Sequence, residues 1–495
     1  MKKLITTIII VCCGFSCVAQ EFVPPTLTKQ QMYEDFDYLV NIIRDVEPRL
    51  EVIKQVTGKN ILSEIEQMQA SIDTITTFSS FYELLERALY LTQDKHNNFT
   101  YYSNDWGLAV LDDTIVAQSN LIMRKNLSFK KGGFIGLFYI NGAYYFDQNI
   151  TGNYEKDTLI FQTGTQVLSV NGIDVDSYLL EYGQKMGSSL RWDAKLKKYY
   201  TKYDYGIYKR SSSAMTIKML NGEVLDVAVP LTVRLRGTIC TDDDEAKVLY
   251  FSNDAILYIR LYEMETELID FYTSEIEKLK DMPIKKVVID IRGNSGGSDK
   301  VWQTILATLI DKPIIYPVKL LIKNTPTAIS YLNQFAGYSI SSTQENEVMI
   351  GNDIFFHLHN TMDTISVEEN TIAYSGNIYV LADERCFSSA GSLISVCGKT
   401  DRLISIGQPT GNINGIGINP FVFSLPHSKL IFWIAAGLEG INTDNVEDYY
   451  HNTIEILVEK SVQEVLFERN WEKELYGEEY LFNYDSTFQK VLELE

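Results

Sequence analysis

The sequence predicts a multidomain protein of the α/β class, and three changes of pattern along the chain indicate its parts. Residues 20–104 place apolar side chains at helical spacing behind capping residues, as in a small helical domain. Residues 105–240 change to short alternating strands rich in Tyr, Phe and Gly, which favours a β-rich domain. Residues 241–455 alternate strands with helices, the pattern of an α/β core, and residues 456–495 form an acidic helical tail.

The N-terminus, residues 1–19, is typical of a secretory signal peptide. Two lysines precede an apolar run that ends at Phe15, too short to span a bilayer, and small residues favour cleavage after Ala19. The alternative is a lipid anchor on Cys17, although the bulky Phe15 fits a lipidation motif poorly. We therefore expect export to the periplasm or the exterior, or, less favoured, a lipoprotein attached to the outer membrane. No later segment is apolar enough to cross a bilayer.

Charge and cysteine content exclude several functions. The formal net charge is -21, and it becomes -23 when the two lysines of the signal peptide are removed. Such a surface repels nucleic-acid phosphates and anionic lipids, which argues against nucleic-acid binding. Cleavage after Ala19 leaves Cys240, Cys386 and Cys397, an odd number that predicts no disulfide framework. A bridge between Cys386 and Cys397 stays open, but buried free thiols are the simpler expectation.

Two helices are expected in the N-terminal part. Thr28 and Gln31 form a capping box for the first, which Pro48 ends. Ser80 and Glu83 suggest a second box, before an apolar stripe in the second helix. His96 follows at the exit of that helix.

The β-rich part contains one informative stretch. Residues 164–172, Gly-Thr-Gln-Val-Leu-Ser-Val-Asn-Gly, resemble the PDZ segment Gly-Asp-x-Ile-Leu-x-Val-Asn-Gly, with Thr165 in place of Asp. A PDZ-like domain would hold the end of a peptide by strand addition. The alternative is a divergent β domain without a peptide groove.

In the core, two strands each run into a tight turn that suits catalysis. The first, residues 287–291, leads to Gly296-Gly297, where missing side chains let backbone amides approach a substrate oxygen as an oxyanion hole. The second, residues 378–381, leads through a short loop to Ser388 at the start of a helix. The alternative is a plain tight turn and a helix cap at Ser388-Ser389.

Taken together, these runs resemble the C-terminal processing and tricorn-core serine peptidases. The family pattern Asp-x-Arg-x-Asn-x-Gly-Gly is matched by residues 290–297, and the nucleophile motif by Cys386-Phe387-Ser388-Ser389. Residues 407–411 and 425–428 are similar to two further family segments. The resemblance implies a crotonase-like ββα core, Ser388 as nucleophile with Ser389 as runner-up, and amides of Gly296 or Gly297 and of Ser389 as the oxyanion hole.

The general base separates two branches of this family. One uses a lysine in a Gly-Lys step, where this chain has Gly411-Asn412, and Lys399 is expected to be a solvated charge at a helix end. The other takes a histidine from an upstream Asp-x-His motif, which is similar to Asp94-Lys95-His96 and makes His96 the expected base. That branch adds a carboxylate, for which Glu439 is the candidate; the alternative is an ordinary turn carboxylate.

The expected function is therefore that of a serine peptidase cleaving peptide or protein substrates, in the tail-specific manner of the family, without a cofactor. His357 and His359 lie two apart on a predicted strand, but no third ligand accompanies them, so a metal site is not expected. The alternative is a catalytically inactive peptidase fold that binds a peptide or hydrophobic ligand, suggested by the missing lysine. The sequence does not specify the oligomeric state.

Overall fold

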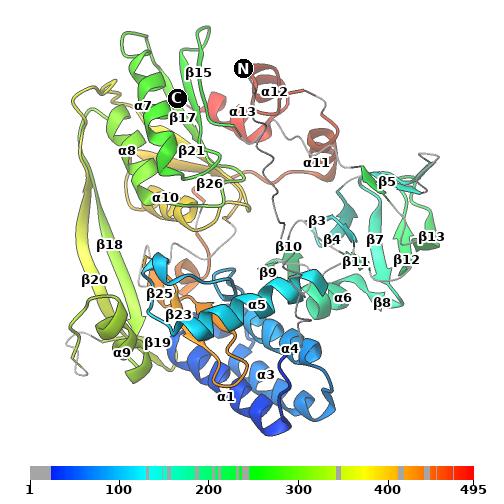
Figure 1. Cartoon of the computed structure of the whole chain (residues 1–495). Helices are drawn as coiled ribbons and strands as arrows, with labels where there is room; N and C mark the ends of the chain where they lie inside the picture. Colours follow the sequence, from blue (N-terminus) through cyan, green and yellow to red (C-terminus); the bar gives the residue numbers. More distant parts are fainter. Residues whose placement is uncertain are drawn as a thin grey trace, which may run out of the picture.

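A computed structural model of the chain describes residues 24–129, 133–147, 149–152, 158–183, 189–202, 207–209, 213–229, 234–236, 245–341, 347–410, 417–439, 446–452, 454–471 and 473–494 (Figure 1). The expected signal peptide with Cys17, the Gly411-Asn412 step and Cys240 lie outside the described residues. Among the helices of these ranges, none combines the length and apolarity that crossing a bilayer requires.

The N-terminal part is a bundle of helices, as expected: α1 (Lys29–Val46), α2 (Leu50–Thr57), α3 (Ile61–Gln67) and α4 (Phe78–Leu91). The capping box at Thr28 and Gln31 is confirmed, since each side chain accepts from the other residue's backbone N–H. The expected box at Ser80 is wrong. Helix α4 begins earlier, because the hydroxyl of Thr77 accepts from the backbone N–H of Ser80 at 3.1 Å.

A further helix, α5 (Asp113–Phe129), lies in the region expected to consist of short strands. Its inward side chains Ile122 and Met123 are buried in the same apolar cluster as α1 and α4. The helical part of the chain therefore extends well beyond residue 104.

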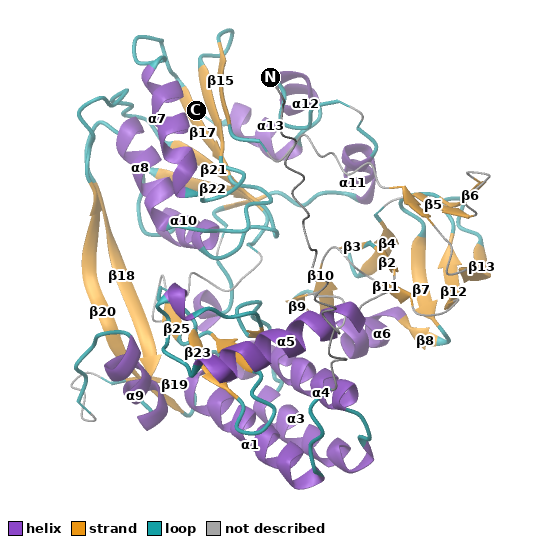
Figure 2. Ribbon diagram, in the orientation of Figure 1, coloured by secondary structure: helices purple, strands orange, loops and turns teal. Residues whose placement is uncertain are grey.

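After α5 comes a small β domain, at the right of Figure 2. Its main sheet has six strands, with β13, β12, β7, β4 and β3 in that order and β8 paired to β7, and helix α6 covers it. The stretch that resembles a PDZ segment forms β7 and β8 with a turn at Asn171-Gly172, both at positive φ. The bounds are β3 (Leu137–Ile140), β4 (Ala143–Phe146), β7 (Gln166–Val170), β8 (Ile173–Asp174), α6 (Val175–Tyr182), β12 (Ser213–Lys218) and β13 (Val224–Val229).

Short strands beside this sheet form three smaller sheets, one of which is the β9–β10 hairpin. They are β2 (Gly133–Ile135) with β11 (Ile207–Lys209), β9 (Ser189–Asp193) with β10 (Lys198–Lys202), and β5 (Asn149–Gly152) between β6 (Thr158–Phe161) and β14 (Arg234–Arg236).

The α/β core is a six-stranded sheet with the order β15-β16-β17-β21-β22-β26. All neighbours pair in parallel except β15 with β16. One apolar cluster joins helices α7, α8 and α10 to the sheet, and a second cluster joins the tail helices α12 and α13 to it. The two groups of helices lie on opposite sides of the sheet in Figure 1. The bounds are β15 (Lys247–Phe251), β16 (Ile256–Arg260), α7 (Ile269–Glu277), β17 (Lys286–Asp290), α8 (Asp299–Leu309), β21 (Ile378–Ala382), α10 (Ser389–Cys397), β22 (Leu403–Gly407), β26 (Ile456–Leu457), α11 (Val462–Arg469), α12 (Glu478–Asn483) and α13 (Ser486–Glu493).

A long antiparallel arm connects this core to the N-terminal helices (Figure 2). It consists of β18 (Ile314–Lys323) and β20 (Asp353–Ile365), with β19 (Val348–Ile350) and β25 (Gly437–Glu439) at their ends and α9 (Pro326–Phe335) between them. A small sheet of β1 (Asn98–Phe99), β24 (Ile431–Ile434) and β23 (Phe421–Ser424) makes a second connection. Side chains of both connections share one apolar cluster with α1 to α5. The strand that follows His96 is thereby fixed to the core.

Candidate active site

Ser388 lies at the junction between the core sheet and helix α10, six residues after the end of β21. Its backbone has φ 55° and ψ -121°, a conformation that residues with a side chain seldom adopt. Strain of this kind is held in place only by the surrounding structure, and it is typical of nucleophiles at the start of a helix. The geometry thus distinguishes Ser388 from an ordinary helix cap, and its hydroxyl caps no helical amide.

The glycine turn after β17 packs directly against this serine. A side chain at Gly296 would place its Cβ 2.6 Å from the carbonyl oxygen of Phe387 and 2.7 Å from the Cβ of Ser388. Both Gly296 and Gly297 also have positive φ, at 101° and 137°. The two runs predicted from the sequence therefore meet, and only glycine fits at the contact.

The amides at this contact are not equivalent. The N–H of Gly296 donates to the side-chain oxygen of Asn294 at 2.7 Å. Within the described part of the chain, the amides of Gly297 and Ser389 donate to no protein acceptor. Ser389 also begins helix α10, where backbone N–H groups favour negative charge. This arrangement makes Gly297 and Ser389 the better-placed pair of oxyanion donors.

The hydroxyl of Ser389 has another partner. It donates to Asp299 Oδ1 at 2.6 Å, and the indole N–H of Trp302 donates to the same oxygen at 3.0 Å. Asp299 is the first residue of α8, so this contact connects the start of α8 to the start of α10. A hydroxyl committed to a carboxylate is a poorer candidate nucleophile than that of Ser388.

His96 lies against Phe387, the residue before Ser388, although the two segments are far apart in the sequence. Its ring stacks on the ring of Phe387, with centroids 4.5 Å apart and an interplanar angle of 26°. Its Nδ1 lies 2.8 Å from Asp94 Oδ1, which also accepts from the His96 backbone N–H at 2.8 Å. A hydrogen bond at Nδ1 fixes the ring orientation and leaves Nε2 as the nitrogen that can exchange a proton.

Asp94 is itself held by a buried cation. Its Oδ2 lies 2.6 Å from Arg49 Nη2, and Glu47 Oε1 contacts the same guanidinium at 2.8 Å. Burial opposes the ionisation of Asp94, but the charge of Arg49 and the contact with His96 outweigh it, so the pKa of Asp94 lies well below its usual range. Asp94 is therefore an anion at neutral pH, in the position of a residue that orients a catalytic histidine.

Glu439 and Lys399 form a separate buried pair, with Lys399 Nζ 3.1 Å from Glu439 Oε1. The expectation of a solvated Lys399 is wrong, since its side chain is 1% exposed. Helix α10 ends at Cys397, and the chain then turns the lysine inward. Burial raises the pKa of Glu439, with a smaller contribution from the charge of Asp299. The structure thus places Asp94, rather than Glu439, on His96, and a role for Glu439 stays a prediction.

Three of the remaining sequence candidates, His359, Cys386 and Cys397, have structural partners, whereas Nδ1 of His357 is buried without a hydrogen bond in the described structure. Nε2 of His359, on β20, lies 3.2 Å from the hydroxyl of Tyr338. Cys386 and Cys397 are buried free thiols, which confirms the expectation that they form no disulfide with each other. Burial raises the pKa of both thiols, so both stay protonated. Cys386 donates to the carbonyl of Ile291 at 3.0 Å and joins the two strand ends of the site.

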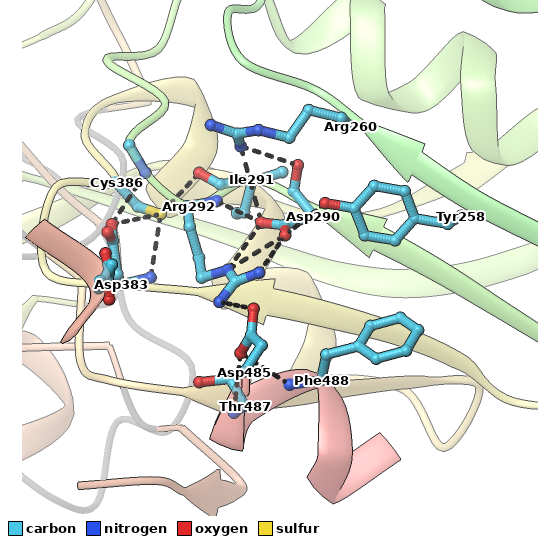
Figure 3. A network of polar contacts seen from close by, with 12 residues as sticks. Tyr258, Arg260, Asp290, Ile291, Arg292, Asp383, Cys386, Asp485, Thr487 and Phe488 are labelled. Atoms are coloured by element: carbon cyan, nitrogen blue, oxygen red, sulfur yellow. Dashed lines mark hydrogen bonds and ion pairs between the residues drawn. The ribbon is translucent and has the colours of Figure 1, made fainter. Parts of the chain in front are cut away.

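A network of buried charges lies under the glycine turn (Figure 3). Asp290, at the end of β17, is paired with Arg292 at 2.6 Å and accepts from the hydroxyl of Tyr258 at 2.8 Å. Arg292 also pairs with Asp485 at 2.7 Å, which caps α13 through the amides of Thr487 and Phe488. The tail is thereby linked to the segment that leads into Gly296.

Some of these supporting residues belong to motifs that the sequence shows, and others have no local sequence signal. Asp94 belongs to the Asp-x-His motif, and Asp290 and Arg292 to the strand-turn motif, so the motifs contained them without giving their roles. Arg49 and Asp485 have no local signal, because their contacts with Asp94 and Arg292 are made only in the folded chain.

Comparison with known proteins agrees with this geometry. The model of peptidase family S41 matches residues 255–430, which include both strand ends, the glycine turn and Ser388. Among solved structures, mature CPAF is similar, with 12% identity, 89% of this chain and 95% of that chain covered, and a TM-score of 0.55. Mature CPAF complexed with lactacystin gives 13% identity, 89% and 96% coverage, and a TM-score of 0.57. No curated protein matches.

At these identities the solved structures show a shared fold, which extends over the helical, β-rich and core parts together. The family match covers the two core motifs, at residues 290–297 and 386–389, and leaves the Asp94-Lys95-His96 motif outside its range. Residues 255–430 therefore match peptidase family S41, which identifies the chain as a serine-type peptidase.

Proposed function

We propose that this protein cleaves peptide bonds with Ser388 as nucleophile, His96 as general base and Asp94 as the residue that orients His96. The proposal rests on the contact between the ring of His96 and the residue that precedes Ser388. The strained Ser388 follows Phe387, whose ring stacks on His96, and Asp94 holds the other edge of that histidine. Gly297 and Ser389 supply the oxyanion donors.

The reaction follows from these positions. Ser388 Oγ attacks the scissile carbonyl carbon while His96 Nε2 accepts the hydroxyl proton. The carbonyl oxygen becomes an oxyanion, which the amides of Gly297 and Ser389 stabilise. His96 then returns the proton to the leaving amine, and an acyl-enzyme remains on Ser388. Water, deprotonated by His96, attacks the acyl-enzyme and releases the second peptide.

Labelling by a fluorophosphonate tests this assignment directly, because only an activated serine reacts. We expect near-stoichiometric label on Ser388 of the purified protein, located by peptide mass mapping. Ser388→Ala and His96→Ala should both abolish it, whereas Ser389→Ala should keep the label. His427→Ala is the matched histidine control, since His427 pairs with Glu34 away from the site.

A folded protein that takes no label would contradict the proposal and favour the inactive, ligand-binding alternative. Label on Ser389, or undiminished label in His96→Ala, would contradict the roles given to those residues.

The finer features of the fold belong to the same proposal. We propose that the sheet of β16, β17, β21 and β22 is a crotonase-like core and that the β domain is PDZ-like, holding the end of a peptide chain so that the enzyme trims tails. The β7–β8 hairpin and helix α6 support the second part. Deletion of the β domain should then abolish the preference for chain ends while Ser388 still reacts with the fluorophosphonate.

Export is proposed from the sequence of residues 1–19. The mature protein should begin at Gln20 and be found in the periplasm or the medium. Mass spectrometry of the protein from its natural source distinguishes this from the alternative, an acylated N-terminal Cys17 on an outer-membrane lipoprotein.

A further inference from the structure

A cavity of about 480 Å³ separates the β9–β10 hairpin from the loops that follow β21 and β22. Trp192 and Tyr200 line it on the side of the hairpin, and Glu384 and Thr410 on the side of the core. The carboxyl ends of parallel strands are where ligands bind in open α/β sheets. Gln93, the residue before Asp94, and Glu384, four residues before Ser388, both line the cavity, which places it near the candidate active site.

Arg191 on β9 lines this cavity and makes no ion pair within the described residues. Its Nε is buried without a hydrogen-bond partner, and within the described residues its guanidinium makes neither an ion pair nor a hydrogen bond. Burial lowers the pKa of Arg191, and the charge of Asp94 offsets this effect only in part. Arg49 and Arg292, by contrast, each hold two carboxylates.

A partly buried guanidinium without an ion-pair partner is costly, and its planar set of N–H donors matches a carboxylate in two parallel hydrogen bonds. We propose that Arg191 binds a carboxylate group of the substrate peptide in this cavity, either the α-carboxylate of a chain end or the side chain of Asp or Glu. The inference rests on the proposed peptidase function, because it assigns the cavity to the substrate. It differs from strand addition to the β domain, since β9 and β10 lie outside the six-stranded sheet.

The other charges of the cavity set its selectivity. Asp193 is turned toward its own hairpin, where its two oxygens accept from the hydroxyl of Tyr139 at 2.7 Å and the N–H of Leu196 at 2.8 Å. Lys195 adds a second positive charge to the lining, and Glu384, Glu447 and Glu459 add three negative ones. The glutamates would repel a carboxylate that does not reach a cation, so the site should take one carboxylate and reject peptides with two adjacent ones.

The site can be tested by binding, without turnover, in the Ser388→Ala protein. The probes are fluorescein-labelled hexapeptides of one apolar sequence in three forms: a free C-terminal carboxylate, a C-terminal amide, and the amide with one internal Asp. In the Ser388→Ala background we expect Arg191→Met to weaken binding of the preferred carboxylate form about tenfold to a hundredfold, and to leave the uncharged amide unchanged. Lys197→Met is the matched control, since it removes a positive charge from the exposed turn of the same hairpin.

The three probes distinguish the sources of the carboxylate. A loss confined to the free C-terminus identifies the α-carboxylate, and a loss confined to the Asp peptide identifies an acidic side chain. Equal binding of all three forms by the parent protein, or equal weakening by Arg191→Met and Lys197→Met, would overturn the inference.

A second measurement is independent of both peptide affinity and the folding of a variant. Phenylglyoxal should modify Arg191 of the unaltered protein, located by mass mapping, and the preferred peptide should protect it. Modification that this peptide does not slow would also overturn the inference. Fluorophosphonate labelling of Ser388 reports on the proposed function separately: protection of Arg191 without label on Ser388 would refute the catalytic proposal alone.

Discussion

Asp94→Asn is the change that most directly tests how the candidate site works. The substitution preserves the size of the side chain but removes the charge that contacts both His96 and Arg49. An amide at this position can donate to Nδ1 of His96, which leaves the proton on Nε2 and prevents that nitrogen from acting as a base. The kcat should fall on the order of 10⁴-fold, equivalent to about 5.4 kcal/mol in the barrier.

The same substitution also leaves Arg49 with one fewer carboxylate. Removing one partner of a buried ion pair costs about 3–5 kcal/mol, and the remaining contact of Arg49 with Glu47 favours the lower end. Part of any loss of activity could thus reflect stability alone.

Glu47→Gln is the matched control for that effect. It also removes a carboxylate from Arg49, at 2.8 Å, but Glu47 makes no contact with His96 in the described structure. Both variants should lower the free energy of unfolding, measured by urea denaturation, by similar amounts. Only Asp94→Asn should lose kcat for a peptide substrate and the rate of fluorophosphonate labelling, assayed well below the unfolding transition.

Two results would refute the reasoning. A kcat in Asp94→Asn within tenfold of the unaltered enzyme would show that Asp94 does not set the state of His96. A loss in Glu47→Gln equal to that in Asp94→Asn would assign the effect to Arg49 and the local packing instead.

Three further predictions concern the glycine turn and the charges beneath it. Gly296→Ala should abolish fluorophosphonate labelling, because the added methyl group would overlap the backbone at Ser388; labelling at an unchanged rate would contradict the packing. Asp485→Asn should keep the cap of α13 but lower the free energy of unfolding by about 3 kcal/mol, because Arg292 loses a buried counter-ion. A loss below about 1 kcal/mol, measured by urea denaturation, would contradict a stabilising role for the pair of Arg292 and Asp485. Burial opposes the ionisation of Asp290, but neighbouring arginines outweigh it and lower its pKa. The contribution of Asp290 to the free energy of unfolding should therefore be complete above about pH 4 and lost as the pH falls below that value. The free energies of unfolding of the unaltered protein and of Asp290→Asn should then converge between about pH 5 and pH 2.

Local signals in the sequence were sufficient for the elements whose structure depends on near neighbours. The capping box at Thr28 and the strand into Asp290 are of this kind. Helix α5 was missed because the aromatic and glycine content around it indicated strands. What stabilises α5 is tertiary, including a hydrogen bond from the backbone N–H of Ile431 to the hydroxyl of Ser119 at 2.9 Å.

The candidate site likewise combines residues that local motifs predict with residues whose contacts form only in the folded chain. Ser388 and His96 were predicted from motifs, because the chemistry confines those residue types to recognisable turns. Lys399 was placed wrongly because the prediction continued a helix past Gly398, where the chain in fact turns. The contact of Arg49 with Asp94 had no counterpart in the sequence, since nothing in either segment specifies which of many carboxylates an arginine will meet.

The separation of His96 and Ser388 along the chain has a consequence for the cell that makes this enzyme. The strand after His96 pairs with β24, which comes after Ser388, and the core sheet is covered by helices that come later still. During synthesis from the N-terminus, His96 therefore cannot be fixed near Ser388 until Ser388 and the segments beyond it have emerged. A partly made chain has no assembled peptidase, and so it can neither digest itself nor attack its neighbours before folding is complete.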